Sequence, residues 1–422
     1  MQITRNKTLV STEQLQALFD DFESISTVLK DGTLSFNSFR TSIEWEELLP
    51  DAFIVKPTLR RSAAIRLFYR ALSQARRDGS LTADAVIAHA KEFYRQDHAV
   101  RLKKFTLWTK IRASGTDQTH SLSFKWGNVS MRTVAKLPKW LQIEPFVSGI
   151  ELVDPSQPRD GGYIILSCQE RLEEDAVDLM IDALQLLMAL MNIYETSGAW
   201  TIATDDNNWT AGGLRMGPFQ FVFQGKKYLG RPWYDPNYDE KAWKKGLTKF
   251  ERYLKIAPYT KKALLTLENH PLKQVLVAAA QLAQDAFEAR DGNHRLLRFW
   301  AALEKIYVAE SARGRSNENV INRASFADED YQITKWKLSH VARLRNEHVH
   351  SRGQQGSFMQ QGQMLRDLLS RHILHWIFHG HDFDTHDALL AYVDLPREDN
   401  ALKALQKNVE RRIKLNEQRQ KS

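Results

Sequence analysis

Cysteine is almost absent from this chain, since Cys168 is the only one among 422 residues. A single thiol excludes an internal disulfide framework and a zinc site built from several thiolates. Cys168 ends the apolar run 163–168, which is typical of a buried strand. These features indicate a protein of a reducing compartment, and we expect the cytoplasm.

Long hydrophobic runs are also lacking. The first residues, Met1 to Arg5, do not form an apolar signal segment. The longest apolar stretch, 179–194, is interrupted by Asp182 and Gln185 and falls short of the roughly 20 residues needed to cross a bilayer. We therefore predict a core helix there and no association with a membrane.

Acidic residues are outnumbered, with 51 Asp and Glu against 59 Lys and Arg, which gives a formal charge of +8. The excess of positive charge favours anionic partners but does not separate nucleic acid from acidic protein or lipid. The hydrophobic and charged fractions, 43% and 26%, are those of an ordinary globular protein. A chain of this length predicts two or three domains, and we expect two main ones.

The first part of the chain, residues 1–257, predicts an α+β region. Helical spacing of Ile65, Phe68 and Leu72 indicates a helix capped by Thr58, and a second helix is expected from Thr82. Short alternating runs then predict strands of an antiparallel sheet, and a long apolar run predicts a helix over 173–194. The expected strands cover residues 105–111, 122–126, 129–134, 163–168 and 219–223.

A change of composition marks the second part, residues 258–422, because the preceding segment 226–258 is rich in Gly, Pro, Trp, Tyr and Lys. Beyond it the pattern predicts an all-α bundle and no strand. The residues after 397 predict a charged helix or a frayed tail, to which we assign no chemistry. The four expected bundle helices cover residues 271–290, 293–310, 330–349 and 357–378.

An arginine enters the apolar stripe of the third of these helices, where Leu338, Val341, Arg345 and His348 recur at spacings of three and four. A charged side chain on such a stripe needs a carboxylate partner or a crevice that is open to an anionic ligand. Glu304, one turn after a tryptophan on the preceding helix, is the nearest candidate by pattern. The same turns carry an amide and two imidazoles, a set that phosphate chemistry can use.

This segment resembles the HEPN ribonuclease motif, an arginine followed by a polar residue and a downstream histidine. Arg345 and Asn346 supply the first two positions and His350 the third. The preceding helix is similar to the aromatic and Ala-Leu-Glu helix of Apea-like HEPN domains, which gives a second, independent match. The residues of that match are Arg298, Phe299, Trp300, Ala301, Ala302, Leu303, Glu304 and Lys305.

The resemblance covers about the last 160 residues and implies a HEPN-type bundle with ribonuclease activity. It implies that Arg345 and His350 form the catalytic pair, that Asn346 supports them, and that two protomers join their motifs across a homodimer interface. It implies cleavage without metal or cofactor, in which the RNA 2′-hydroxyl attacks and leaves a 2′,3′-cyclic phosphate and a 5′-hydroxyl. By analogy, the protein acts in prokaryotic antiviral defence or as a toxin, and residues 1–257 sense a trigger, bind a regulatory partner or select the RNA.

Helix geometry complicates that site, because residues five apart on a straight helix point about 140° away from each other. Ser351, Arg352 and Gly353 indicate that the helix ends near His350, and a partner subunit offers another solution. His348 lies on the Arg345 side and is a supporting candidate, like Glu304. Two alternatives stay open: Arg345 and the histidines form only ion pairs, or the bundle dimerises and binds RNA or a nucleotide without cleaving it.

Three other segments carry residues with binding chemistry. Basic and aromatic residues are interleaved over 226–255, where Arg231, Lys244 and Lys245, together with Arg352, are candidates for RNA contact, although much of the aromatic content also fits a core. The arginine-rich helix over 60–77 is more typical of a charged solvent face, with RNA contact as the alternative. The third segment resembles a zinc or manganese spacing, yet it lacks a second ligand group, and we predict a polar loop and no metal. Its residues are His379, His381, Asp382, Asp384, His386 and Asp387.

Overall fold

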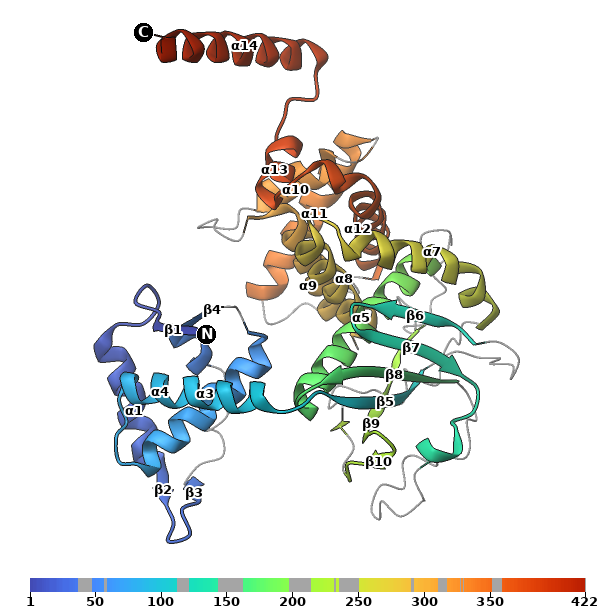
Figure 1. Ribbon diagram of the computed structural model, residues 1–422. Helices are drawn as coiled ribbons and strands as arrows, with labels where there is room; N and C mark the ends of the chain where they lie inside the picture. Colours follow the sequence, from blue (N-terminus) through green and yellow to red (C-terminus); the bar gives the residue numbers. More distant parts are fainter. Residues whose placement is uncertain are drawn as a thin grey trace. The chain divides into compact units, whose positions relative to one another are not determined.

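The computed structural model describes most of the chain, and its helices and strands are coloured along the sequence in Figure 1. The described residues are 1–36, 48–56, 59–111, 121–142, 162–196, 214–230, 233–234, 250–289, 292–309, 317–326, 328, 330–350 and 359–421. Two compact units can be separated. The first comprises Met1–Leu107, Ser167–Ile181 and Val222–Leu229, and the second comprises Trp108–Leu166, Asp182–Phe221 and Gly230–Ser422.

The described part of the first unit begins with three helices and two small sheets. The helices are α1 (Thr12–Ile25), α3 (Arg61–Arg77) and α4 (Ala83–Ala99). Strands β1 (Gln2–Arg5) and β4 (Phe53–Lys56) pair antiparallel, as do β2 (Ser26–Val28) and β3 (Leu34–Phe36), and the 3-10 turn η1 (Leu49–Ala52) precedes β4. Phe19, Phe22 and Phe68 are fully buried in the core that these elements share.

The sequence predicted the N-cap residue of α4 correctly and that of α3 incorrectly. Thr82 caps α4 as predicted, because its side chain accepts a hydrogen bond from the backbone of Ala85. The prediction for α3 was wrong at its start, since the N-cap is Arg60, whose backbone is extended and whose side chain makes no capping hydrogen bond. Thr58 lies outside the described residues. The two small sheets were not predicted.

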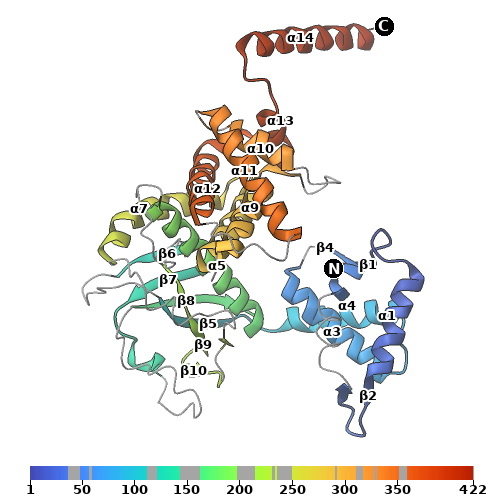
Figure 2. The same cartoon turned by 180° about the vertical axis from the view of Figure 1, so that it is seen from behind.

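A larger sheet has the strand order β10-β9-β5-β8-β7-β6, with β11 paired to β9, and Figures 1 and 2 show β6, β7, β8 and β5 in this order. Strands β5 to β9 agree with the five predicted runs, whereas β10 and β11 were not predicted. Strands β6 and β7 pair antiparallel, with Phe124 opposite Met131. The strands of this sheet are β5 (Lys103–Ile111), β6 (Ser123–Trp126), β7 (Val129–Val134), β8 (Gly162–Glu170), β9 (Met216–Gln224), β10 (Lys227–Tyr228) and β11 (Trp233–Tyr234), with the 3-10 turn η2 (Lys139–Leu141) after β7.

The apolar helix predicted after the sheet is α5 (Glu173–Thr196). It is the one helix of the described chain that is long and apolar enough to cross a membrane, but 72% of its apolar window is buried inside the protein. It therefore has the burial of a core helix, as predicted. Cys168, in the preceding strand, is also buried, and burial raises the pKa of its thiol to about 12.

The C-terminal part of the second unit is helical. Its helices are α7 (Phe250–Glu268), α8 (Lys273–Glu288), α9 (Gly292–Tyr307), α10 (Asn317–Phe326), α11 (Tyr331–His350), α12 (Met359–His379), α13 (His386–Val393) and α14 (Asp399–Lys421), with the 3-10 turn η3 (Gly380–Asp382) after α12. Among the described residues beyond 250 no strand occurs. The predicted all-α region and its four expected helices are present, while α7, α10 and α13 were not foreseen. Residue 258, predicted as a boundary by composition, lies inside α7.

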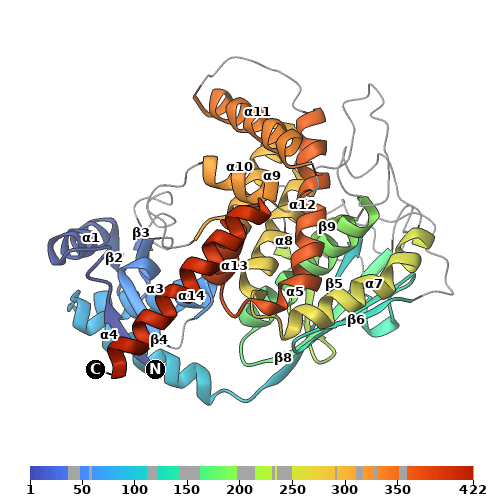
Figure 3. The same cartoon turned by 90° about the horizontal axis from the view of Figure 1, so that it is seen from above.

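The centre of this bundle is formed by α8, α9 and α12, which pack on one another and lie side by side in Figures 1 and 3. Helix α11 packs on α10 and also on α9. Phe299 and Trp300 of α9 are fully buried, and so is Ile373 of α12. This packing determines where the polar residues of α9, α10 and α11 meet.

A buried amide fixes the bundle to the helix that follows the sheet. The side chain of Asn192 donates to the backbone oxygen of Leu214 and to Oε1 of Gln284, both at 3.0 Å, and its oxygen accepts from the Leu214 backbone nitrogen at 2.9 Å. The three hydrogen bonds satisfy a fully buried polar group that would otherwise cost free energy. The hydrogen bond to Gln284 connects α5 and α8, and the two with Leu214 connect α5 to the residues before β9.

Candidate functional site

Arg345 and Glu304 form an ion pair between α11 and α9, as the sequence pattern predicted for the partner of this arginine. Nη2 of Arg345 lies 3.5 Å from Oε1 of Glu304. The carboxylate oxygen also accepts a hydrogen bond of 3.0 Å from Nε1 of Trp300, one turn earlier on α9. Because Trp300 is fully buried and Glu304 is 8% exposed, the carboxylate has a well-defined position.

The guanidinium of Arg345 has two further neighbours. Nη1 donates to Oδ1 of Asn317 at 3.3 Å, and Cζ lies 5.9 Å from the centre of the Trp300 ring. Nδ2 of Asn317 donates to Oδ1 of Asn346 at 3.4 Å, so α10 connects the two adjacent site residues of α11. Trp300, Glu304, Asn317, Arg345 and Asn346 thus form one network, which we call the Arg345 cluster.

The Arg345 cluster leaves part of the guanidinium available. Its side chain is 28% exposed, and Nε is buried without a hydrogen-bond partner among the described residues. A guanidinium carries five N–H donors, of which one makes a hydrogen bond here and another faces the carboxylate at a long distance. Within the described residues, α9 and α10 thus position a guanidinium that remains partly exposed.

Sequence reasoning missed Asn317, because the short helix α10 was not predicted. The signal was weak: Val320, Ile321 and Ala324 have helical spacing and are buried or nearly so, but they span little more than one turn. Asn317 stands at the start of that helix, where Asn is common. A prediction of α10 would have placed this amide next to the motif helix.

The remaining predicted site residues fall outside the described part of the structure. The backbone of α11 is described up to His350. The side chains of His348 and His350 lie outside the described residues. So do Arg352, Arg231, Lys244 and Lys245, which were candidates for RNA contact.

A second polar network is buried one turn further along α9. The hydroxyl of Tyr307 lies 2.8 Å from Nδ1 of His372 and accepts a hydrogen bond of 2.9 Å from Nε1 of Trp376. Burial raises the pKa of Tyr307. Burial, with a smaller contribution from Arg371, lowers the pKa of His372 to about 3. His372 is therefore a neutral core residue at physiological pH, with a structural role.

The histidine-rich segment after α12 does not assemble a metal site. Nε2 of His386 lies 2.7 Å from the backbone oxygen of Ile306, while the His381 ring lies 4.2 Å from that of His270. His379 contacts His375 instead. Within the described residues no group of three or more His, Cys, Asp or Glu side chains is arranged to hold a metal ion. The segment divides into separate contacts because α12, η3 and α13 point its residues in different directions.

The arginine-rich helix α3 uses most of its cations in ion pairs of the first unit. Arg61 contacts Asp51, Arg66 contacts Asp175, Arg70 contacts Asp97 and Arg76 contacts Glu23, at distances between 2.7 and 3.0 Å. This pattern agrees with the reading of α3 as a charged helix face.

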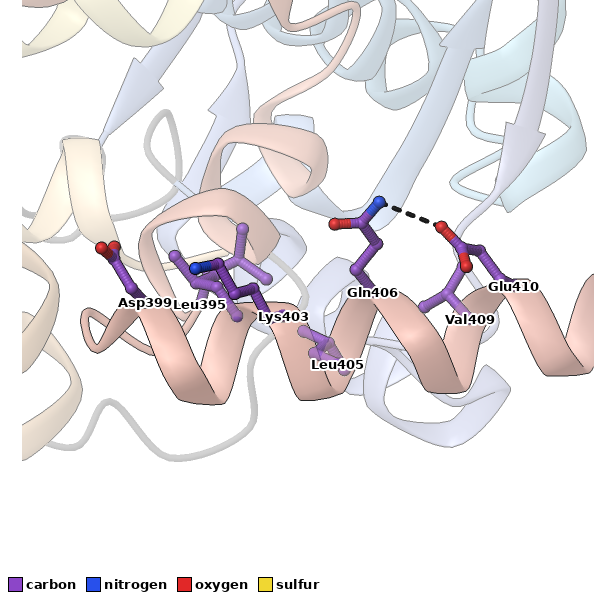
Figure 4. Close-up of a pocket in the computed structure, with 8 residues that line it drawn as sticks. Leu395, Asp399, Lys403, Leu405, Gln406, Val409 and Glu410 are labelled. Atoms are coloured by element: carbon purple, nitrogen blue, oxygen red, sulfur yellow. Dashed lines mark hydrogen bonds between the residues drawn. The ribbon is translucent and has the colours of Figure 1, made fainter.

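A groove of ≈ 570 Å³ lies at the start of α14. Figure 4 shows the residues that line it. Its charged residues are Asp399, Lys403 and Glu410, and Nε2 of Gln406 donates to Oε1 of Glu410 at 3.0 Å. These charges have no net positive sign, and they lie mostly along one helix. The groove is therefore a poorer phosphate site than the Arg345 cluster.

Comparison of the chain with protein-family models, with curated proteins and with solved structures finds no match. The assignment of a function consequently depends on the residues and on their geometry.

Proposed function

We propose that this protein is a metal-independent endoribonuclease of the HEPN type, with its site at the Arg345 cluster. The observation that carries the proposal is the partly exposed guanidinium of Arg345, which Glu304 and Asn317 hold in place at the helix that bears the His350 motif. Asn346 belongs to the same network through Asn317. A guanidinium has the planar donor geometry that suits phosphate oxygens.

The chemistry follows from the substrate's own nucleophile. The RNA 2′-oxygen attacks the adjacent phosphorus, the bond from phosphorus to the 5′-oxygen breaks, and the products are a 2′,3′-cyclic phosphate and a 5′-hydroxyl. One proton leaves the 2′-hydroxyl and one reaches the departing 5′-oxygen, a pair of transfers that imidazole can perform. We assign the proton transfer to His350, with support from His348, and charge stabilisation on the phosphate to Arg345. Glu304 positions Arg345, and no step is assigned to a metal or cofactor.

A homodimer completes the proposal. Because α11 continues without interruption from Tyr331 to His350, Arg345 and His350 leave the helix about 140° apart. A two-fold axis beside α11 places Arg345 of one protomer near His350 of the other. In this proposal residues 1–257 sense a trigger, bind a regulatory partner or select the RNA, and the protein acts in the cytoplasm in antiviral defence or as a toxin.

One observation favours a second candidate function, a bundle that dimerises and binds RNA or a nucleotide without cleaving it. Glu304 already neutralises part of the charge of Arg345, as in the interhelical ion pairs that only stabilise a fold. The two candidates differ in whether a phosphodiester bond is broken.

The test is cleavage of a labelled single-stranded RNA by the purified full chain in excess chelator, with analysis of the product ends. We expect cyclic phosphate ends from the native protein and at least a 100-fold loss of rate in Arg345→Ala and in His350→Ala. Arg298→Ala is the matched control, because it removes another interhelical arginine pair, with Asp285, at 2.9 Å. Full activity in both site variants would contradict the assigned site. Loss of cleavage in chelator that is reversed only by added zinc or manganese would contradict the metal-free reaction. Binding of RNA without cleavage would support the second candidate.

A further inference from the structure

Helix α11 exposes a large apolar surface on the side away from its packed stripe. Trp336 is 72% exposed and Ile333, one turn earlier, is 50% exposed, whereas Leu338 and Val341 are fully buried. In the described part of the chain no large hydrophobic side chain is more exposed than Trp336. A single exposed apolar residue is common, but an indole that projects this far offers an open π face to a ligand.

The charge of the segment that carries this indole is positive on balance. Residues 330–347 contain two lysines and two arginines against Asp330 and Glu347, a formal charge of +2. Lys337 and Arg343 are exposed, and Nη2 of Arg343 lies 3.3 Å from Nδ1 of His340. Arg343 follows Trp336 by seven residues, which places it on the same face about 10 Å further along the helix. We call Ile333, Trp336, Lys337, His340 and Arg343 the Trp336 face.

We propose that the Trp336 face binds single-stranded RNA, with one base stacked on the indole and the backbone held by Lys337 and Arg343. The choice of RNA as the ligand rests on the proposed function. An exposed aromatic ring flanked by cations is the arrangement that proteins use to hold single strands, because every base has a π face and every nucleotide a phosphate. Such contacts are tolerant of sequence, so this face contributes affinity and does not select particular bases.

Charge also argues against a second copy of this chain as the occupant. Two Trp336 faces related by a two-fold axis would bring Lys337 and Arg343 near their own copies, and the four cations of residues 330–347 outnumber Asp330 and Glu347. An anionic partner gains from the same charges. The face therefore fits a polyanion with stacking surfaces better than it fits itself.

The position of the face relative to Arg345 defines what it can do. Arg345 follows Trp336 by nine residues, so the two side chains leave the helix on opposite sides, about 13 Å apart along its axis. A strand stacked on Trp336 consequently contacts the enzyme outside the cleaved linkage. Loss of the indole weakens binding and raises KM, while kcat is retained.

The experiment measures binding separately from cleavage. A fluorescein-labelled RNA with 2′-O-methyl riboses cannot be cleaved by 2′-oxygen attack, and its anisotropy is followed as the full chain is added. Trp336→Ala should raise Kd by about tenfold or more, and Trp336→Phe should restore most of the affinity. Tyr259→Ala is the matched control, since Tyr259 is an aromatic residue of the same unit that is 60% exposed. Lys337→Gln and Arg343→Gln should each reduce the dependence of log Kd on log salt by about 0.7.

Several results would overturn the inference. The first is a Kd that Trp336→Ala leaves unchanged, and the second is an increase in Kd that is equally large in Tyr259→Ala. The third is a Trp336→Ala chain that binds RNA normally but sediments as a monomer where the native chain is a dimer. This third result would assign the face to self-association. Failure of the two proposals can be told apart: loss of binding in Trp336→Ala with no cleavage by the native chain contradicts only the ribonuclease. Cleavage that requires Arg345 but shows normal binding in Trp336→Ala contradicts only the Trp336 face.

Discussion

The ion pair between Glu304 and Arg345 should contribute measurably to stability, and a double-mutant cycle isolates its contribution. The variants are Glu304→Gln, Arg345→Met and the combination of both. Glutamine keeps an oxygen that can accept from Trp300, and methionine keeps much of the apolar stem of arginine. The cycle therefore removes the charge interaction with little change in packing.

The expected magnitude follows from distance and burial. At the observed 3.5 Å, an effective dielectric constant of 20 gives a gross attraction of about 5 kcal/mol. Most of this is offset because the carboxylate side chain, which is 10% exposed, has lost its hydration. The arginine side chain is 28% exposed, so the pair is intermediate between a surface and a buried one. We expect a net coupling free energy of about 1–2 kcal/mol.

The assay is urea unfolding of the full chain, followed by far-ultraviolet circular dichroism, with the four free energies of unfolding combined in the cycle. Arg298 and Asp285 provide a matched control: their distance is shorter, 2.9 Å, but their side chains are 51% and 36% exposed. We expect a coupling below about 0.5 kcal/mol there. If the control pair couples as strongly as Glu304 and Arg345, or if the site pair couples by less than about 0.3 kcal/mol, the reasoning from burial is wrong.

Two further predictions concern assembly and pH. Mixing Arg345→Ala protein with His350→Ala protein should restore part of the cleavage activity, because a composite site in the heterodimer regains one intact pair. If no cleavage returns after subunit exchange has been verified, both residues act within one chain. The pKa of His372 is about 3 in the folded protein and 6.5 in the unfolded chain, so the unfolded chain takes up a proton first as pH falls. The folded state should therefore lose about 2 kcal/mol of stability between pH 7 and pH 5. Urea unfolding at both pH values should show a smaller loss of stability in His372→Gln. The control His294→Gln alters an exposed histidine of α9 and should keep the full loss. Equal pH dependence of stability in all three proteins would refute the prediction.

Sequence patterns predicted the long elements well, for physical reasons that can be read from particular residues. Helix α5 was predicted because the apolar stretch 179–194, although interrupted by Asp182 and Gln185, is long enough to form a core helix. Strands β6 and β7 were predicted because Gly127 and Asn128 separate two alternating runs, and Gly127 has a φ of 54°, which glycine adopts without strain. In both cases the signal is local.

Elements that depend on distant partners were missed. Strands β1 and β4 have four residues each, and they are stabilised by pairing Gln2 with Lys56 across more than fifty positions. No local pattern specifies such a partner. Helix α10 is short, and its packing on α11 determines its position. Since Asn317 belongs to α10, one member of the Arg345 cluster could not be predicted, whereas Glu304 could, because the Trp300 spacing and the arginine in the stripe of α11 are both visible in the sequence.

The packing of α11 separates its cations into two groups. Arg345 faces α9, where Glu304 holds it at a defined position, and a fixed cation is what charge stabilisation on a reacting phosphate requires. Lys337 and Arg343 lie on the exposed side, where salt screens them strongly and where they can follow a flexible strand. If both proposals hold, rising salt should weaken RNA binding through the exposed cations while the rate of cleavage of bound RNA changes little. A fall of kcat in parallel with affinity would instead mean that Arg345 is as open to solvent ions as the exposed cations are.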